Sequence, residues 1–244
     1  MLQDSNVPFH PIDGWLARFP WLLAGITHGG SADEPFDLRL FGETPPLGAK
    51  ERWRSLLGAT GFGGIAHAQQ VHETRVAVHG EAFSGVHIES EPADGHFTSH
   101  AGVLLSVTVA DCVPVYMVEP ERRIVALLHA GWRGIAGRIL EQGIRVHEEH
   151  GAVASGLEMH LGPAICGGCY EVGPEVFDAL GLETPPRPTP VDLRAVLVRQ
   201  ALALGIPRSQ ITVSDQCTLC GTASLFSHRG MRPERQAALL GIRT

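Results

Sequence analysis

Lysine is nearly absent from this 244-residue chain, which has it only at Lys50. Acidic residues outnumber lysine and arginine by 26 to 19, so the formal net charge is −7 and the pI is about 6.0. No basic run interrupts this balance. A surface of this kind repels the phosphate backbone, so we expect no nucleic-acid partner. A small anion held in one pocket is compatible with the composition.

Long apolar runs are missing too. The longest, GVLLSVTVADCVPVYMV (102–118), contains Asp111 and Pro114, so it fits a buried strand better than a membrane span. The first residues, MLQDSNVPFHPIDGW, lack a basic segment followed by an apolar one, as a secretory signal would have. The five cysteines are an odd number, typical of reduced thiols available for metal binding or catalysis. We therefore expect a cytoplasmic protein with no membrane partner.

Strand-like and helix-like segments are mixed along the chain. Apolar spacing and closing glycines predict helices over 51–61, 134–151, 174–181 and 191–206. Runs of β-branched and apolar residues predict strands over 74–78, 102–109, 112–118, 123–130, 157–165 and 211–218. Several strands are adjacent in sequence, which favours mixed sheets over a strictly parallel one.

Cys112 and His129 lie at or near the ends of two predicted strands, in ADCVPVYMVEPERRIVALLHAGWRG (110–134). Taken singly, a buried cysteine is usually an inert hydrophobe, and a histidine at a strand end is usually a hydrogen-bonded core residue. Adjacent strands can bring the two to one sheet edge, where a third ligand would complete an open zinc site. His72, just before another predicted strand, is the preferred third ligand, and His67 is the weaker alternative.

The turn after His129 is rich in glycine. Gly131 and Gly134 flank Trp132 and Arg133, and a helix is expected to begin at about residue 135. Backbone N–H groups at such a turn suit an anion, to which Arg133 could add a forked contact. The alternative is a tight strand-to-helix turn with a surface arginine.

Two CxxC pairs form a competing metal signal. They are CGGC (166–169) and CTLC (217–220), the spacing of a four-thiolate structural zinc site. The 47 residues between them exceed the usual spacing of about 15–20. A second, structural zinc is therefore kept as a minority hypothesis.

Several motifs occur together in a characteristic order. They are QVH (70–72), ADCVPV (110–115), HAGWRG (129–134), GPAI (162–165), CYEVG (169–173), CT (217–218) and LFSHR (225–229). In this order they resemble the YfiH/YlmD family, also called the laccase-domain or "multicopper polyphenol oxidase" family, over about residues 20–240. The resemblance implies one YfiH-like domain over 1–244, an α+β sandwich in which helices flank two mixed β-sheets. It also implies that His72, Cys112 and His129 are zinc ligands.

The same resemblance implies an enzyme that acts on purine nucleosides. It would cleave adenosine, inosine or methylthioadenosine with phosphate to the base and a pentose 1-phosphate, and deaminate adenosine to inosine. Zinc lowers the pKa of water, which suits attack on adenine C6. Phosphorolysis needs an anion site beside the sugar, for which the Gly131–Gly134 turn with Arg133, and also Arg229, are candidates. Asp111, next to the metal cysteine, is a candidate general acid or base beside the three ligands. The expected partners are the nucleoside and phosphate, and the sequence carries no signal for the number of subunits.

Some positions depart from the family pattern. Thr27 stands where the family motif near the start has an arginine, and His228 and Gly230 replace the tyrosine and second arginine of a motif near the end. Cys166 stands at a usual glycine. If the missing arginines bind phosphate in relatives, these departures weaken the inference of phosphorolysis even if the zinc site is intact.

Three alternatives to nucleoside chemistry remain. A laccase-like copper polyphenol oxidase would need a trinuclear cluster built largely from His-x-His pairs. The sequence has none, although two histidines and a cysteine can hold one copper. A metal-free cysteine hydrolase would use Cys112 as nucleophile and His129 as its base. A zinc-stabilised binding module would need the metal for folding and catalyse nothing.

Overall fold

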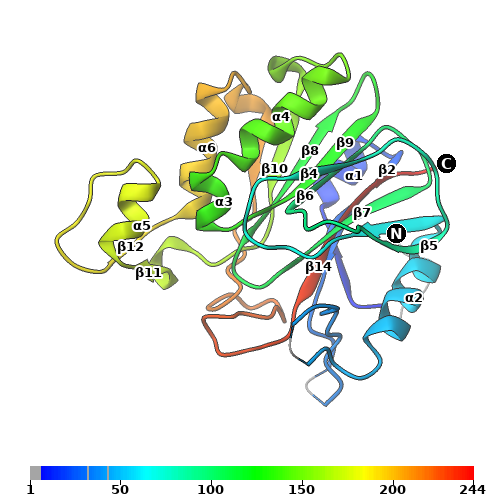
Figure 1. Ribbon diagram of the computed structural model, residues 1–244, viewed down its shortest axis with the longest axis horizontal. Helices are drawn as coiled ribbons and strands as arrows, with labels where there is room; N and C mark the ends of the chain where they lie inside the picture. The colour runs from blue at the N-terminus through cyan, green and yellow to red at the C-terminus, as the bar shows by residue number, and fades with distance from the viewer. Residues whose placement is uncertain (1–6, 32, 43) are drawn as a thin grey trace.

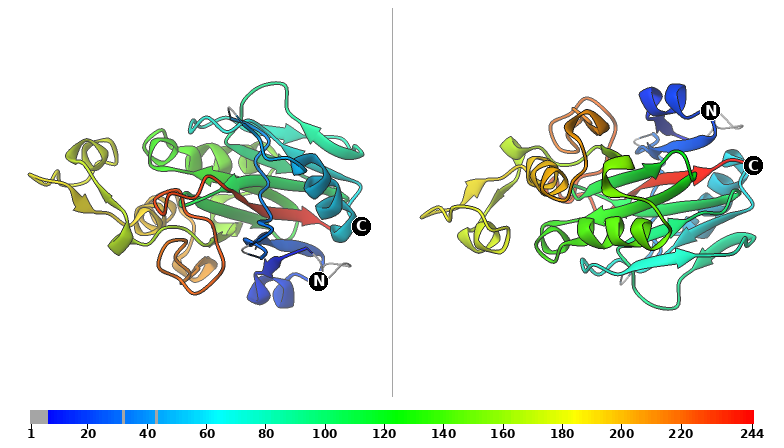
Figure 2. Two further views of the ribbon diagram at one scale, coloured as in Figure 1. Left: turned by 90° about the horizontal axis from the view of Figure 1, so that it is seen from below. Right: turned by 90° about the horizontal axis from the view of Figure 1, so that it is seen from above.

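The computed structural model describes residues 7–31, 33–42 and 44–244, and over these residues the strands build two six-stranded sheets (Figures 1 and 2). The first sheet runs, in spatial order, through β1 (Phe9–Pro11), β2 (Leu22–Thr27), β14 (Gln236–Ile242), β7 (Val103–Val109), β3 (Gly64–His67) and β5 (Gly85–Ile88). The second runs through β13 (Ile211–Val213), β10 (Glu158–Leu161), β8 (Val113–Glu119), β9 (Ile124–Ala130), β6 (Gly95–Thr98) and β4 (Val76–His79). Each sheet has parallel and antiparallel neighbours, so the predicted pair of mixed sheets is confirmed.

Helices cover the outer faces of both sheets. On the first sheet lies α2 (Ala49–Thr60), and on the second lie α3 (Trp132–Ala136), α4 (Ile139–Glu149) and α6 (Leu193–Ala203) (Figure 1). The short helix α1 (Asp13–Arg18) packs at the edge of the inter-sheet core through Trp15. Helix α5 (Pro174–Ala179) lies between β11 (Glu171–Val172) and β12 (Thr189–Pro190), which pair antiparallel, and together they form the yellow arm at the left of Figure 1. The architecture is thus the predicted α+β sandwich.

Alternation along the central strands builds three apolar layers. Leu104 packs under α2 while its neighbour Leu105 faces the second sheet. In the same way Leu127 faces the first sheet and Leu128 packs under α4. Because both faces of these strands are covered, β8, β9 and β14 are buried at every residue, which is why they read as continuous apolar runs. Among the described residues, no helix combines the length and apolar character needed to cross a bilayer.

Three predicted elements differ from the structure, one of which is the strand predicted over 157–165, which ends at Leu161. The helix predicted over 134–151 is two helices, α3 and α4, because Arg138 adopts a left-handed φ of 68° between them. The strand predicted over 211–218 ends at Val213, because Arg194 of α6 donates to the carbonyl oxygens of Ser214 (2.7 Å) and Gln216 (3.0 Å). These carbonyl groups are satisfied outside the sheet, so the chain is free to turn away.

Candidate metal centre and its cavity

The structure brings His72, Cys112 and His129 together from three segments. His129 lies in β9, opposite Pro114 of β8, so Cys112 at the start of this hairpin lies beside it. His72 comes from the loop between β3 and β4. The ligand atoms of all three lie within 4.8 Å of one another, with Cys112 Sγ 3.9 Å from His72 Nε2. His67, the weaker candidate, is instead buried against Trp53 and Ser106.

Asp94 holds two of these segments in place, and the sequence interpretation missed it. Its side chain is fully buried, and Oδ1 accepts hydrogen bonds from His129 Nδ1 (2.7 Å) and from the His72 backbone N–H (3.0 Å). Oδ2 accepts from the N–H groups of Val71 (3.1 Å) and Glu73 (2.9 Å). Because Nδ1 of His129 is engaged by Asp94, its Nε2 is the nitrogen that could bind a metal, and a carboxylate behind the ring is the usual arrangement for a metal-bound histidine.

The charges of Cys112 and His129 support each other. Burial works against a Cys112 thiolate, but the His129 charge and hydrogen bonds from His129 and His72 lower the pKa of Cys112 to about 6. Burial likewise opposes a charged His129, yet the Cys112 thiolate and Asp94 raise the pKa of His129 to about 9. Without a metal, a thiolate therefore faces an imidazolium near neutral pH. The thiolate is the form in which cysteine binds metals.

The backbone around the cluster is strained. His72 and Asp111 have φ values of 62° and 86°, in the left-handed region that costs non-glycine residues about 1–3 kcal/mol each. Asp94 holds the backbone at His72 in this conformation by accepting hydrogen bonds from three successive backbone N–H groups. Such strain persists where the surroundings enforce it, typically at functional sites.

Gly131 leaves the space that the cluster needs. A Cβ at this position would lie 2.9 Å from His72 Cδ2 and 3.0 Å from Cys112 Sγ. Gly134, the other glycine of the predicted anion turn, is buried in α3, where a Cβ would lie 3.1 Å from the carbonyl oxygen of Glu73. Of these two glycines, Gly131 lines the cavity around the cluster and Gly134 does not.

A cavity of about 800 Å³ surrounds the His72–Cys112–His129 cluster. Its lining includes the predicted Arg133 and Arg229, and two arginines that the sequence interpretation did not single out, Arg39 and Arg235. Arg133 lies over the Trp132 ring at 4.3 Å and Arg229 over the Tyr170 ring at 5.1 Å. Burial and the charge of Arg39 lower the pKa of Arg235, and both residues line this cavity. The cavity is thus suited to an anion.

Asp37 keeps these two arginines at the cavity. It is buried and pairs with the Arg39 guanidinium at 2.9 Å, while its Oδ1 accepts the Arg235 backbone N–H at 3.0 Å. Thr27, which stands where the family pattern has an arginine, is fully buried and accepts the Ala237 N–H at 2.9 Å. Position 27 therefore supplies no cation here, and the cavity takes its cations from other positions.

Asp111 also lines the cavity, with both carboxylate oxygens engaged. One accepts the Thr218 hydroxyl and the other the Arg229 backbone N–H, each at 2.6 Å. These bonds connect the residue before Cys112 to the loop between β13 and β14. In this geometry Asp111 positions that loop against the cluster.

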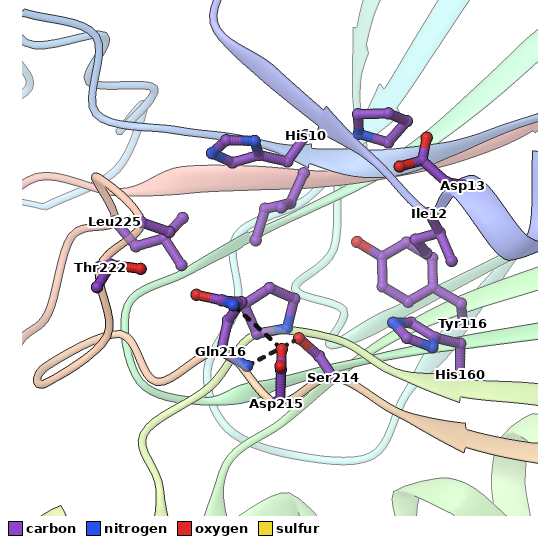
Figure 3. A pocket seen from close by; sticks show the side chains of 14 residues that line it. His10, Ile12, Asp13, Tyr116, His160, Ser214, Asp215, Gln216, Thr222 and Leu225 are labelled. Carbon is purple, nitrogen blue, oxygen red and sulfur yellow. Dashed lines mark hydrogen bonds between the residues drawn. The ribbon is translucent and has the colours of Figure 1, made fainter.

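A second cavity, of about 540 Å³, lies away from the cluster (Figure 3). Tyr116 and His160 line it on one side, and Ser214, Asp215 and Gln216 on another (Figure 3). Gln216 hydrogen-bonds to Asp215 and to Ser214 within it. None of the predicted site residues is in its lining, so it is a separate feature.

Comparison with known proteins places the chain in a family. The family model described as multi-copper polyphenol oxidoreductase laccase matches residues 43–243. Purine nucleoside phosphorylase YlmD of Geobacillus stearothermophilus is 41% identical over 164 residues, which are 62% of this chain and 60% of that protein's length. Adenosine deaminase RL5, from an unknown prokaryotic organism, is 34% identical over 190 residues, 71% of this chain and 72% of that protein.

The fold agrees with this assignment. The crystal structure of YlmD from Geobacillus stearothermophilus superposes with a TM-score of 0.84 at 28% identity, covering 100% of this chain and 99% of that one. The match of the family model and the shared architecture lead to one conclusion: the chain belongs to the multi-copper polyphenol oxidoreductase laccase family, the YfiH/YlmD family that its motifs resemble.

Proposed function

We propose that this protein is a zinc-dependent purine nucleoside phosphorylase that also deaminates adenosine. Its substrates would be adenosine, inosine or methylthioadenosine together with phosphate, and its products the base and a pentose 1-phosphate. The observation that carries the proposal is the His72–Cys112–His129 cluster at a cavity that arginines line. The cavity volume of about 800 Å³ is within the usual range for small-molecule sites. Relatives named purine nucleoside phosphorylase and adenosine deaminase support it.

The residues of the cluster fit zinc. Two imidazole nitrogens and one thiolate sulfur are the ligands of an open zinc site, which keeps a fourth position for water or substrate. His129 has the carboxylate behind it that such sites require. When bound, zinc supplies a Lewis acid and lowers the pKa of water. Among the described residues only this cluster and the four CxxC cysteines gather metal ligands, so no histidine-rich trinuclear copper site is available.

The arginines are assigned to phosphate. Arg39 lies in the loop between β2 and α2, and Arg235 directly precedes β14. Arg133 lies in α3, and Arg229 in the loop between β13 and β14. Forked guanidinium groups bind phosphate oxygens in pairs. Arg39 and Arg235 would take the place of the arginines that the family pattern has elsewhere. Asp111 stays a candidate acid or base, acting with the cluster only if substrate displaces one of its two bonds.

Chromatography of adenosine incubated with and without phosphate tests the function. We expect adenine to form in the presence of phosphate and inosine in its absence, and Cys112→Ala or His72→Ala to abolish both. His87→Ala is the matched control for the second variant, because His87 is also an exposed histidine and lies outside the cavity. Adenosine that stays intact under all conditions, with zinc bound, would contradict the proposal.

A second candidate is a metal-free cysteine hydrolase. The Cys112 thiolate, His129 and Asp94 form a connected series that resembles an activated nucleophile with its base and orienting carboxylate. The two candidates differ in their response to a chelator. A zinc enzyme loses its activity when the chelator removes the metal. A cysteine hydrolase keeps its activity under the same treatment and is inactivated by iodoacetamide.

A further inference from the structure

The two CxxC pairs, 47 residues apart in sequence, meet in the fold. Strands β10 and β13 pair in parallel. The two segments that follow these strands remain side by side through a β-bridge between Ala164 and Cys217. The CGGC segment follows the first strand and the CTLC segment the second. The sulfur atoms of all four cysteines lie within 4.8 Å of one another. Sheet pairing therefore supplies the convergence that the long sequence spacing left unexplained.

The distances match metal coordination better than a disulfide. Cys166 Sγ lies 3.8 Å from Cys220 Sγ. A tetrahedral zinc with Zn–S bonds of about 2.3 Å places its sulfur atoms about 3.8 Å apart, whereas a disulfide has an S–S distance of about 2.05 Å. Four thiolates with no open position are typical of a structural site.

Backbone hydrogen bonds point at the sulfur of Cys217. The N–H groups of Cys166, Leu219 and Cys220 donate to it at 3.3, 3.4 and 3.5 Å. A thiolate sulfur is an acceptor, so the backbone is organised for negative charge at this atom. Gly221 closes the second segment, donating to the Cys217 carbonyl oxygen at 3.0 Å. A Cβ on it would lie 2.3 Å from that oxygen, so the tight turn requires glycine.

We propose that Cys166, Cys169, Cys217 and Cys220 bind a second zinc ion in a closed, four-thiolate structural site. Soft thiolate sulfurs select zinc over hard cations. The site shares no residue with the His72–Cys112–His129 cluster, so its metal content can be tested apart from the nucleoside chemistry. Cys217 is buried while Cys220 is exposed, so the ion has a route in from solvent.

The second ion would brace the catalytic side of the molecule. It would join the loop after β10 to the loop after β13, the orange-to-red segment below the sheets in Figure 1. Thr218, the residue directly after Cys217, donates to Asp111, and Asp111 precedes Cys112. Zinc in the four-thiolate site would thus fix one wall of the reaction cavity without contacting substrate.

Metal content separates the two sites. Purified wild-type protein should hold about two zinc ions per chain, by the ligand counts of one open and one closed site. Cys166→Ser/Cys220→Ser should hold about one, and His72→Ala/Cys112→Ser should also hold about one. If the first double variant keeps the zinc content of the wild type, the four-thiolate site does not exist. A failure of adenosine turnover in wild-type protein that holds two zinc ions would instead count against the proposed function alone.

Two further tests, cobalt substitution and thiol counting, leave the four cysteines unchanged and so do not depend on whether a variant of these cysteines folds. Cys112→Ser protein loaded with Co²⁺ should show the intense thiolate-to-cobalt absorption of a tetrahedral site, since its remaining four cysteines are the proposed ligands. Absence of this absorption would overturn the proposal. So would finding that the four cysteines of freshly purified protein are disulfide-bonded, or that they hold iron and sulfide in place of zinc.

Discussion

Replacing Asp94 by asparagine tests how strongly the carboxylate behind His129 governs metal affinity. Asp94 accepts four hydrogen bonds with two oxygens. Asparagine has one carbonyl oxygen in place of two carboxylate oxygens. Two of the four N–H donors therefore lose their acceptor and face an NH₂ group instead. At about 1–3 kcal/mol for each unsatisfied group, the free energy of unfolding should fall by about 2 to 6 kcal/mol. Loss of the carboxylate behind a ligating histidine typically weakens metal binding about 10- to 100-fold, or about 1.4 to 2.7 kcal/mol.

The assay for Asp94→Asn is competition for zinc against a chelator, with thermal unfolding of the same samples. The Asp215→Asn variant is the control, because this exposed carboxylate lies at the second cavity and touches no part of the cluster. We expect the control to bind zinc as the wild type does. If Asp94→Asn also binds zinc with wild-type affinity while it unfolds earlier, Asp94 only supports the loop, and the reasoning about His129 is refuted.

Three further predictions address the cavity. In metal-free protein, the rate of Cys112 alkylation should rise with pH with a midpoint near pH 6, because the thiolate predominates above the lowered pKa of Cys112. In His129→Ala this midpoint should move to higher pH. An unchanged midpoint would argue against the ion pair between Cys112 and His129. Arg39→Ala should raise the KM for phosphate roughly 10- to 100-fold, the equivalent of one lost charge-assisted contact, with little change in the KM for nucleoside. Equal changes in both KM values would show that Arg39 does not belong to the phosphate site. Gly131→Ala should lower zinc content, because the new Cβ meets His72 and Cys112; a crystal structure with the cluster unmoved would contradict this.

The sequence predicts the centre of this fold better than its periphery. Strands β7, β8 and β9 are covered on both faces, so burial imposes unbroken apolar runs that mark them in the sequence. Strands β3 and β6, with the sequences GIAH and GHFT, are short and carry little apolar pattern. They exist because longer neighbours offer hydrogen-bonding partners, which is tertiary information.

The candidate site shows the same division. Cys112 and His129 could be predicted because each lies at or near the end of a recognisable strand. Asp94 could not, since its role arises only when β6 pairs with β9 and the loop around His72 folds over it. Arg39 and Arg235 are brought together by Asp37, through a hydrogen bond between residues 198 positions apart, and local sequence carries no trace of that contact.

The position of the cavity at the junction of the two sheets has a mechanical consequence. Arg39 lies in the loop after β2 and Arg235 directly precedes β14, both strands of the first sheet, whereas Cys112 directly precedes β8 and His129 lies in β9 of the second. The distance between these arginines and the Cys112–His129 pair is therefore set by how the interior side chains, such as Leu105 and Leu127, pack between the layers. A substitution deep in that interior would change this distance, although it alters none of the groups that line the cavity.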